Sequence, residues 1–258
     1  GWRPGIHLTS SRLERGLFRL HRFYNKEGRL LATVNIRGRA FDPQRQTEKL
    51  VVQVGAGPLV RVRMEGADLS KSRMRQLLPF YLEGVVDDTA LERGRQNLED
   101  HFERQGYHSA SASVQQTRSA DSQTSDITYN TELGERGEFV GYEFRGNQEV
   151  PSGELAKVLT IHPKDFFRER GVFSREMLRQ DIRAMKELYE SHGFLEAQIT
   201  PHVDSHHDNR KGRLFVTFEI NEGLRTRVAR LTLSGLNGEM EKGLWPLLLT
   251  KPGQPYSP

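Results

Sequence analysis

Three segments of the chain share one pattern of apolar positions, which recur at i, i+4, i+7 and i+11 before a glycine. Such spacing lines one face of a helix. The positions are Leu13, Leu17, Leu20, Tyr24 and Gly28; then Leu91, Arg95 in the second slot, Leu98, Phe102 and Gly106; then Leu178, Ile182, Met185, Tyr189 and Gly193. A residue able to cap a helix amino terminus stands nineteen positions before each glycine, namely Thr9, Asp87 and Ser174. Three long helices are therefore predicted.

Each predicted helix is followed by two segments typical of strands. Apolar residues alternate with polar ones at Ala32, Val34, Ile36; at Ala110, Ala112, Val114; and at Ala197, Ile199, Val203. A period of two indicates a strand with one buried face. A polar loop leads to a second strand over 50–54, 127–133 and 214–220. We expect each pair to form a hairpin whose second strand lies in the centre of a sheet and whose first strand lies at an edge.

A short joint containing glycine ends each hairpin. The joint residues are Gly55, Gly57, Pro58, Gly134, Gly137, Glu222 and Gly223. Another strand follows each joint, over 60–64, 140–144 and 228–233, and ends in a glycine. A shorter helix should come next, with an apolar stripe at 74, 77, 78 and 81 after the potential cap Ser70, and at 155, 158 and 159 after Ser152.

The pattern therefore repeats as strand, helix, helix, strand, strand. The anchoring glycines recur at intervals of 78 and 87 residues, which is typical of a repeat architecture. The predicted fold class is α+β: tandem βααββ modules in an elongated array, each a three-stranded mixed sheet covered by two helices. The predicted domains are the carboxyl-terminal part of a module at 1–58, whole modules at 59–137 and 138–225, and the start of another at 226–258. We expect rigid modules with variable angles at the joints.

This unit resembles a POTRA domain. That family ends its long helix in Tyr/Phe-x-x-x-Gly-Tyr/Phe and places an alanine in the next strand. The motif stands here as Phe102 to Tyr107 with Ala110, and as Tyr189 to Phe194 with Ala197. The turn at 144–147 and the Glu222-Gly223 step also match. Two positions depart from the pattern: Arg29 replaces an aromatic residue, and Arg136 stands where the step would have glycine.

The resemblance is to the POTRA repeats of bacterial outer-membrane β-barrel assembly factors, the BamA/TamA-type surface antigens. It implies a periplasmic location, as part of an outer-membrane protein. The implied partners are unfolded outer-membrane β-barrel proteins, accessory assembly lipoproteins and a carboxyl-terminal membrane barrel of the same protein. A two-partner secretion transporter or a division-type scaffold is the alternative, and the number of modules favours the assembly factor.

Composition narrows the classes of function. The 38 Lys and Arg against 34 Asp and Glu leave a net charge of +4, mixed along the chain, so nucleic-acid binding is not expected. The absence of cysteine excludes disulfides, thiolate metal sites and a thiol nucleophile. No run approaches the ~18 apolar residues of a membrane span. The start at Gly1 carries no signal peptide, which favours a mature or excised piece of a longer protein.

The strand after Gly106 is the candidate client-binding edge, with the residues Ser109, Ala110, Ser111, Ala112, Ser113 and Val114. It contains no proline or charge, and an extended client could add to it through backbone hydrogen bonds. We expect the N–H groups of Ser111 and Ser113 to point outward. The corresponding strand after Gly193 contains Pro201, whose direction the sequence leaves open, and the strand after Gly28 carries Arg37 and Arg39.

Other chemistry is not indicated. His202 and His206 form the one cluster with metal-ligand spacing, but they fall in a predicted hairpin loop, where a solvated loop is the simpler interpretation. No nucleophile elbow, phosphate loop or zinc-protease motif is present. We therefore expect neither an enzyme nor a cofactor or metal site.

Overall fold

The structure is a computed structural model, and it describes residues 5, 7–235, 244, 248 and 251–256. The chain divides into two compact units. The first comprises 1–101 and 110–133, and the second comprises 102–109 and 134–258. Within the described residues no helix is both long and apolar enough to cross a membrane.

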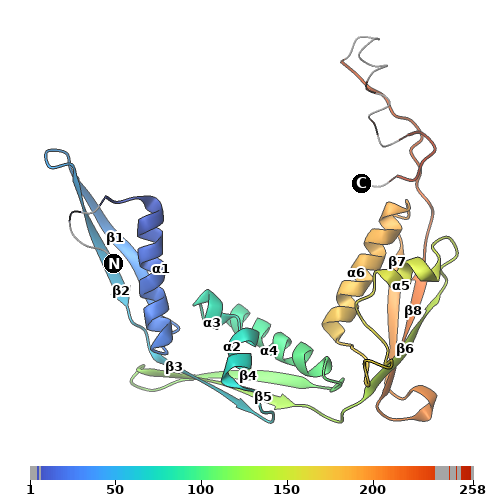
Figure 1. Cartoon of the computed structure of the whole chain (residues 1–258), viewed down its shortest axis with the longest axis horizontal. Helices are drawn as coiled ribbons and strands as arrows, with labels where there is room; N and C mark the ends of the chain where they lie inside the picture. Colours follow the sequence, from blue (N-terminus) through green and yellow to red (C-terminus); the bar gives the residue numbers. More distant parts are fainter. Residues whose placement is uncertain (1–4, 6, 236–243, 245–247, 249–250, 257–258) are drawn as a thin grey trace. The chain divides into compact units, whose positions relative to one another are not determined.

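Up to β8 the helices and strands follow the predicted order, except that α2 and α3 stand where one short helix was expected (Figure 1). Residues up to β5 form α1 (Ser10–Lys26), β1 (Thr33–Asp42), β2 (Thr47–Gly55), β3 (Leu59–Glu65), α2 (Lys71–Leu77), α3 (Phe80–Glu83), α4 (Asp88–Glu103), β4 (Ser111–Arg118) and β5 (Thr124–Glu132). The rest of the chain forms β6 (Glu138–Arg145), α5 (Ser152–Lys157), α6 (Arg175–Ser191), β7 (Gln198–Asp204), a 3-10 turn (His207–Asn209) and β8 (Arg213–Asn221).

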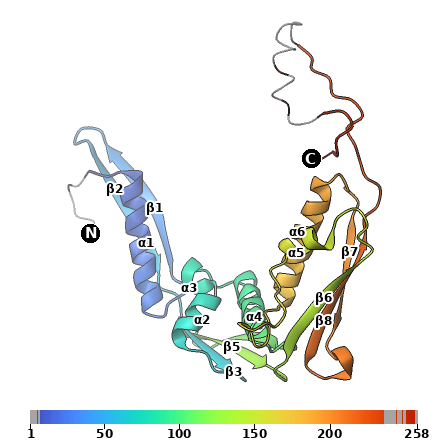
Figure 2. The same ribbon diagram turned by 45° about the vertical axis from the view of Figure 1, so that its right-hand side comes forward.

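Two of the sheets have three strands and the same topology. Their orders are β3-β5-β4 and β6-β8-β7, and in each the central strand is parallel to the first strand and antiparallel to the last. The helices cover one face of each sheet (Figure 2). The third sheet is the hairpin of β1 and β2. The predicted α+β class, the mixed sheets and the central and edge positions are confirmed.

The three hairpins also share one register. The first residue of each edge strand lies five positions after the anchoring glycine, and it pairs with the residue two positions before the joint glycine. These pairs are Thr33 with Gly55, Ser111 with Glu132, and Gln198 with Asn221; the last two are equivalent in the two complete modules.

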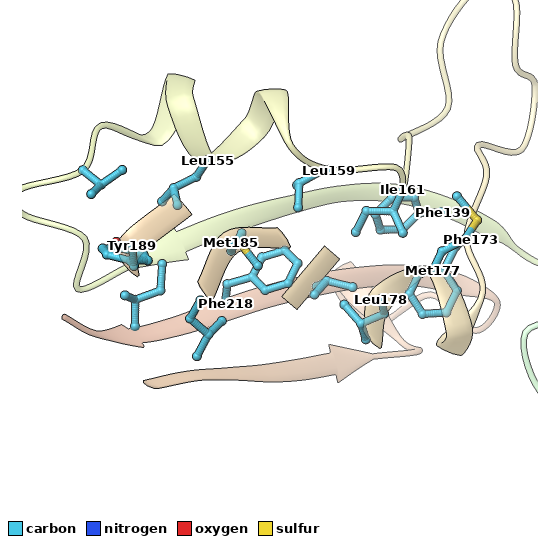
Figure 3. Close-up of a cluster of buried hydrophobic side chains, with 14 of the residues drawn as sticks. Phe139, Leu155, Leu159, Ile161, Phe173, Met177, Leu178, Met185, Tyr189 and Phe218 are labelled. Carbon is cyan, nitrogen blue, oxygen red and sulfur yellow. The ribbon is translucent and has the colours of Figure 1, made fainter. Parts of the chain in front are cut away.

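Each three-stranded sheet packs its own core against the helices. In the first unit Leu78, Phe80, Leu98 and Ile127 are fully buried. The second core gathers side chains from β6, α5, α6 and β8 around Met185 (Figure 3). Burial of one such side chain stabilises the fold by about 1.5–3 kcal/mol. The second core closes within one sheet and its helices, whereas the first core also includes Leu30 from the segment after α1.

The long helices begin where the sequence predicted. The hydroxyl oxygens of Thr9 and Ser174 accept hydrogen bonds from backbone N–H groups three residues later. A carboxylate oxygen of Asp87 accepts the N–H of Ala90 at 2.7 Å. Ser70 caps α2 in the same way.

Three local predictions were wrong. The stripe from 74 to 81 is not one helix, because Pro79 lacks an N–H and Leu78 is extended, so α2 ends before α3 begins. Ser152 is the first residue of α5 instead of its cap, and its hydroxyl accepts a hydrogen bond from the Asn147 amide. No strand forms among the described residues of 226–235, where a single bridge joins Arg227 to Pro255. A strand there would need the central strand of a further module as its partner.

Candidate functional site

Strand β4 is the candidate site, and it lies at the edge of its sheet. It pairs with β5 from Ser111 opposite Glu132 to Arg118 opposite Ser125 without a register shift. Within the described residues no strand flanks its other side, so half of its backbone groups have no partner within the sheet. Of the predicted edge residues, Ser109 and Ala110 precede the strand, and the other four open it.

Two hydrogen bonds reveal which amides of β4 face outward. The N–H of Ser119 donates to the carbonyl of Thr124 at 3.0 Å, which makes that pair a hydrogen-bonded one. Such pairs alternate along an antiparallel ladder, so Ser111 and Ser113 direct their N–H groups toward β5. The N–H of Ala112 instead donates to the Glu99 carboxylate at 2.9 Å. The expectation that Ser111 and Ser113 present outward amides was therefore wrong.

The outward amides belong to the alternate set of residues. By the same alternation they are those of Ala112, Val114, Gln116 and Arg118. Their N–H groups point away from β5, and the side chains of Ala112, Val114 and Gln116 lie on the more buried face of the strand. Among the described residues, no partner is recorded for the outward N–H of Val114 or of Gln116. This stretch carries the accessible backbone donors.

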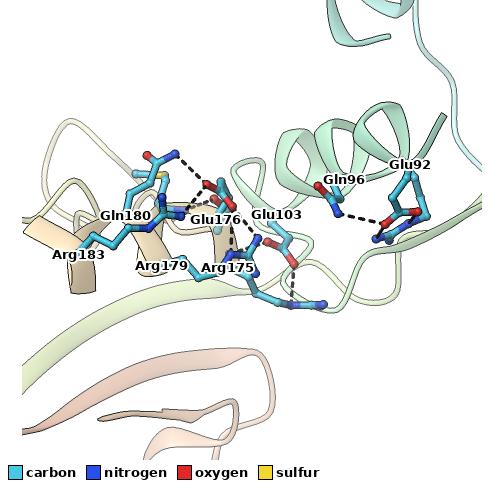
Figure 4. Close-up of polar contacts among 11 residues, drawn as sticks. Glu92, Gln96, Glu103, Arg175, Glu176, Arg179, Gln180 and Arg183 are labelled. Carbon is cyan, nitrogen blue, oxygen red and sulfur yellow. Dashed lines mark hydrogen bonds and ion pairs between the residues drawn. The ribbon is translucent and has the colours of Figure 1, made fainter. Parts of the chain in front are cut away.

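A carboxylate covers the first outward amide. Glu99 of α4 accepts the N–H of Ala112 and also bonds Arg95 at 2.5 Å. Arg95 bonds Glu92 on its other side, and that hydrogen bond raises the pKa of Arg95 above its usual value. Figure 4 shows Glu92 with its neighbour Gln96 on α4. The expectation that no charged side chain protects this edge was wrong. Glu99 of α4 binds the outward N–H of Ala112. The Arg95–Glu99 spacing of four was the signal in the sequence.

The equivalent edge β7 is interrupted. Pro201 lies eight residues after Gly193, as Val114 lies eight after Gly106, and the two strands share one register. The outward direction of the Val114 N–H therefore applies to Pro201, which has no N–H to offer. The missing donor faces outward, which resolves the direction that the sequence left open.

The edge β1 is broken in a different way. Its ladder with β2 shifts register between Ile36 and Gly38, a bulge that reverses which amides face outward. Beyond it, Arg39 forms an ion pair with Glu48. Of the three edges next to a hairpin, β4 alone runs without a bulge or a proline among the described strands.

The joints repeat one backbone contact. The carbonyls of Gly28, Gly106 and Gly193 accept an N–H from the residue three positions after Gly57, Gly134 and Gly223, at 2.8, 2.7 and 2.7 Å. Gly106 and Gly193 have φ of +96° and +90°, a left-handed conformation that ends the helix and favours glycine. The same contact thus recurs at all three helix ends.

An arginine accompanies this contact. Arg136 donates to the carbonyl of Gln105 and stacks on Tyr107, while Arg225 donates to the carbonyl of His192 and stacks on Phe194. The two arginines are equivalent, each two residues after a glycine with positive φ, Gly134 or Gly223. The prediction that Arg136 stands at the position of Gly223 was therefore wrong by two positions, because Gly134 is the equivalent of Gly223. At the first joint, Arg29 provides the guanidinium and donates to the carbonyl of Gly57.

Glu222 of the third joint holds a turn inside its module. Its buried carboxylate accepts the N–H groups of Gln148, Glu149 and Val150 and the hydroxyl of Tyr189. Burial raises the pKa of Tyr189, and the bond to Glu222 adds to the shift. Glu222 therefore ties the turn after β6 to the end of α6, a structural role.

An ion pair between a buried carboxylate and a half-exposed arginine lies at the start of α6. Glu103 is 3% exposed and binds both the backbone N–H and the guanidinium of Arg175, at 2.7 and 2.8 Å (Figure 4). Beside it, burial lowers the pKa of His108 to about 4. The His108 ring packs edge-on against Phe173, and neither of its nitrogens has a hydrogen-bond partner among the described residues.

His202 and His206, the two histidines with metal-ligand spacing, do not form a metal site. His202 is in strand β7 instead of the predicted loop, and it contacts Glu219 across the ladder at 3.1 Å. His206 follows the strand and bonds Ser205. In the part of the chain that the structure describes, no group of three or more potential ligands gathers.

Comparison with known proteins agrees with this architecture. The POTRA family model, described as surface antigen variable number repeat, matches residues 59–134 and 139–223. The chain is 22% identical over 160 residues to the outer membrane protein assembly factor BamA of Nitratidesulfovibrio vulgaris, covering 60% of this chain and 19% of that protein. It is 24% identical over 201 residues to a putative outer membrane protein assembly factor of Treponema pallidum, covering 75% and 23%.

The chain thus spans less than a quarter of the length of these two relatives. Among solved structures, POTRA domains 3–5 of Haemophilus influenzae BamA align over 84% of this chain and 83% of that one, with 14% identity and a TM-score of 0.43. Because the family model matches well over half of the residues, the chain belongs to the POTRA family, in the form found in BamA-type outer-membrane assembly factors.

Proposed function

We propose that this region acts in the periplasm as part of an outer-membrane protein assembly factor and receives unfolded β-barrel precursors. In this proposal the precursor adds a strand to β4. Accessory assembly lipoproteins and a membrane barrel of the same protein are its other proposed partners. The region acts as a binding scaffold, with no catalytic step.

The free stretch of β4 carries this proposal. Val114 and Gln116 offer outward N–H groups on a strand that has no proline and no bulge. Pairing through backbone groups makes little demand on the client's sequence, which suits a receiver of many precursors. Each hydrogen bond gained contributes about 0.5–1.5 kcal/mol, so a few pairs give weak, reversible binding.

A pair of proline substitutions tests the proposal. Val114→Pro removes an outward donor and should weaken binding of a peptide from a barrel's last strand by roughly 2- to 13-fold, the equivalent of one hydrogen bond. Ser113→Pro removes a donor that faces β5, and it should unfold the module. The measurements are fluorescence anisotropy of the labelled peptide and circular dichroism.

Gln116→Pro provides a second outward position with the same expected effect. If both outward prolines leave the module folded and the affinity unchanged, the client does not pair with β4. If Ser113→Pro leaves the module as stable as the outward variants do, the assigned direction of the amides is wrong.

A further inference from the structure

A groove in the first unit combines apolar side chains with positive charge. It has a volume of about 640 Å³ and lies between α1 and the pair α2–α3. Its lining includes Phe18, Arg22, Asn25 and Lys26 on α1, Arg75 on α2 and Leu82 on α3. We call it the cationic groove. A volume of this size lies within the range of pockets that hold ligands.

The apolar part of the cationic groove is open to solvent. Phe18 is 64% exposed and Leu82 is 79% exposed, whereas Leu30 and Val60 at its base are buried. Covering one large apolar side chain contributes about 1.5–3 kcal/mol. A ligand that brings apolar side chains between these two residues would gain most of that free energy.

The charges of the cationic groove have no counterpart within the described chain. No described carboxylate lies within ion-pair distance of Arg22, Lys26 or Arg75. Glu83, which also lines the groove, is bound on both oxygens by Arg93. The groove therefore presents an excess of positive charge, which favours an anionic ligand.

One side-chain acceptor completes the arrangement. The side-chain oxygen of Asn25 is buried and has no donor among the described residues, while the amide nitrogen of the same side chain contacts His21. An unpaired buried acceptor costs about 1–3 kcal/mol, so a ligand whose binding turns this oxygen toward an N–H donor would gain that free energy. A peptide backbone N–H is such a donor.

We propose that the cationic groove binds an acidic, amphipathic peptide segment of a partner protein. Its carboxylates would lie near Arg22, Lys26 and Arg75, and its apolar side chains would cover Phe18 and Leu82. A concave site with helices on both sides suits a narrow peptide better than a lipid surface. The site uses helices instead of the β4 edge, so it stands independently of the client proposal.

The probe is a fluorescein-labelled 12-residue peptide of glutamate and leucine, measured by anisotropy against the same peptide with glutamine in place of glutamate. The glutamate peptide should bind, and it should bind more weakly as the salt concentration rises. Arg75→Glu and the double variant Arg22→Glu/Lys26→Glu should each weaken binding by roughly tenfold or more. Arg63→Glu, which changes the same charge on the exposed side of β3, is the matched control and should have no comparable effect.

Charge exchange keeps the test decisive. The Arg22→Glu/Lys26→Glu variant should bind a lysine and leucine peptide that the native protein does not bind, and circular dichroism should show each variant folded. The proposal is overturned by equal binding of the glutamine peptide, by an equal effect of Arg63→Glu, or by no peptide binding at all. Binding to anionic phosphatidylglycerol vesicles without peptide binding would also overturn it, in favour of a lipid ligand.

Discussion

Removal of the Glu99 side chain should open the β4 edge by one more amide. In the native protein the Glu99 carboxylate holds the N–H of Ala112 at 2.9 Å, next to the free donor of Val114. In Glu99→Ala that N–H becomes available, so a client strand can begin its pairing two residues earlier. If the client edge is β4, this substitution should increase affinity.

The structure sets the size of the effect. One additional backbone hydrogen bond contributes about 0.5–1.5 kcal/mol, which corresponds to roughly 2- to 13-fold tighter binding. The variant also loses the Arg95–Glu99 pair, whose side chains are 24% and 17% exposed. A pair of this spacing contributes about 0.3–0.5 kcal/mol, so the variant should remain folded with a small loss of stability.

Glu92→Ala is the matched control, because Glu92 also binds Arg95 but does not touch β4. Both variants are assayed with the same labelled barrel peptide by anisotropy. Tighter binding for Glu99→Ala and unchanged binding for Glu92→Ala is the predicted result. Equal affinity of Glu99→Ala and the native protein would refute the reasoning that the carboxylate restricts the edge.

Other positions give independent predictions. Glu222→Gln replaces a carboxylate oxygen with an amide group beside N–H donors, and should lower the free energy of unfolding by about 1–3 kcal/mol in urea; an unchanged value would show that the turn does not need the charge. The pKa of His108 is lowered to about 4 from 6.5, so the unfolded chain binds more protons between those values and stability should fall as pH drops through that window. His108→Phe should reduce the dependence of the melting temperature on pH in that window, and an unaltered dependence would contradict this. A Cβ on Gly146 would lie 2.1 Å from the carbonyl oxygen of Ile220, so Gly146→Ala should destabilise the fold by more than about 2 kcal/mol. Gly153→Ala, where a Cβ meets open space, should not, and similar melting temperatures for the two variants would argue against the close approach.

Much of the fold was predictable because its signals are local. The caps Thr9, Asp87 and Ser174 and the helical stripes depend on residues within a few turns of one another. The edge and central positions of the strands followed from the hairpin order. The spacing of apolar residues was misleading at Pro79, because a stripe of correct helical spacing contains a residue that a helix interior does not tolerate.

The candidate site was less predictable because it depends on pairing across the sheet. Alternation of Ser111, Ala112 and Ser113 reveals which side chains share a face, but not which amides face β5. That direction is set by the register with β5. Glu99, which binds the N–H of Ala112, lies thirteen residues before it, so only the packing of α4 against β4 brings the two together. Arg136 and Arg225 were not recognised as equivalent, because the glycines with positive φ, Gly134 and Gly223, define the equivalent positions.

Hydrogen exchange at single amides of β4 tests the central claim most directly. Addition of an unfolded barrel peptide should slow exchange at Val114 and Gln116, whose N–H groups face outward, and leave Ser113 as protected as before. In Glu99→Ala the new protection should extend to Ala112. If the peptide binds and the amides of Val114 and Gln116 gain no protection, strand addition at β4 is not how this region holds its client.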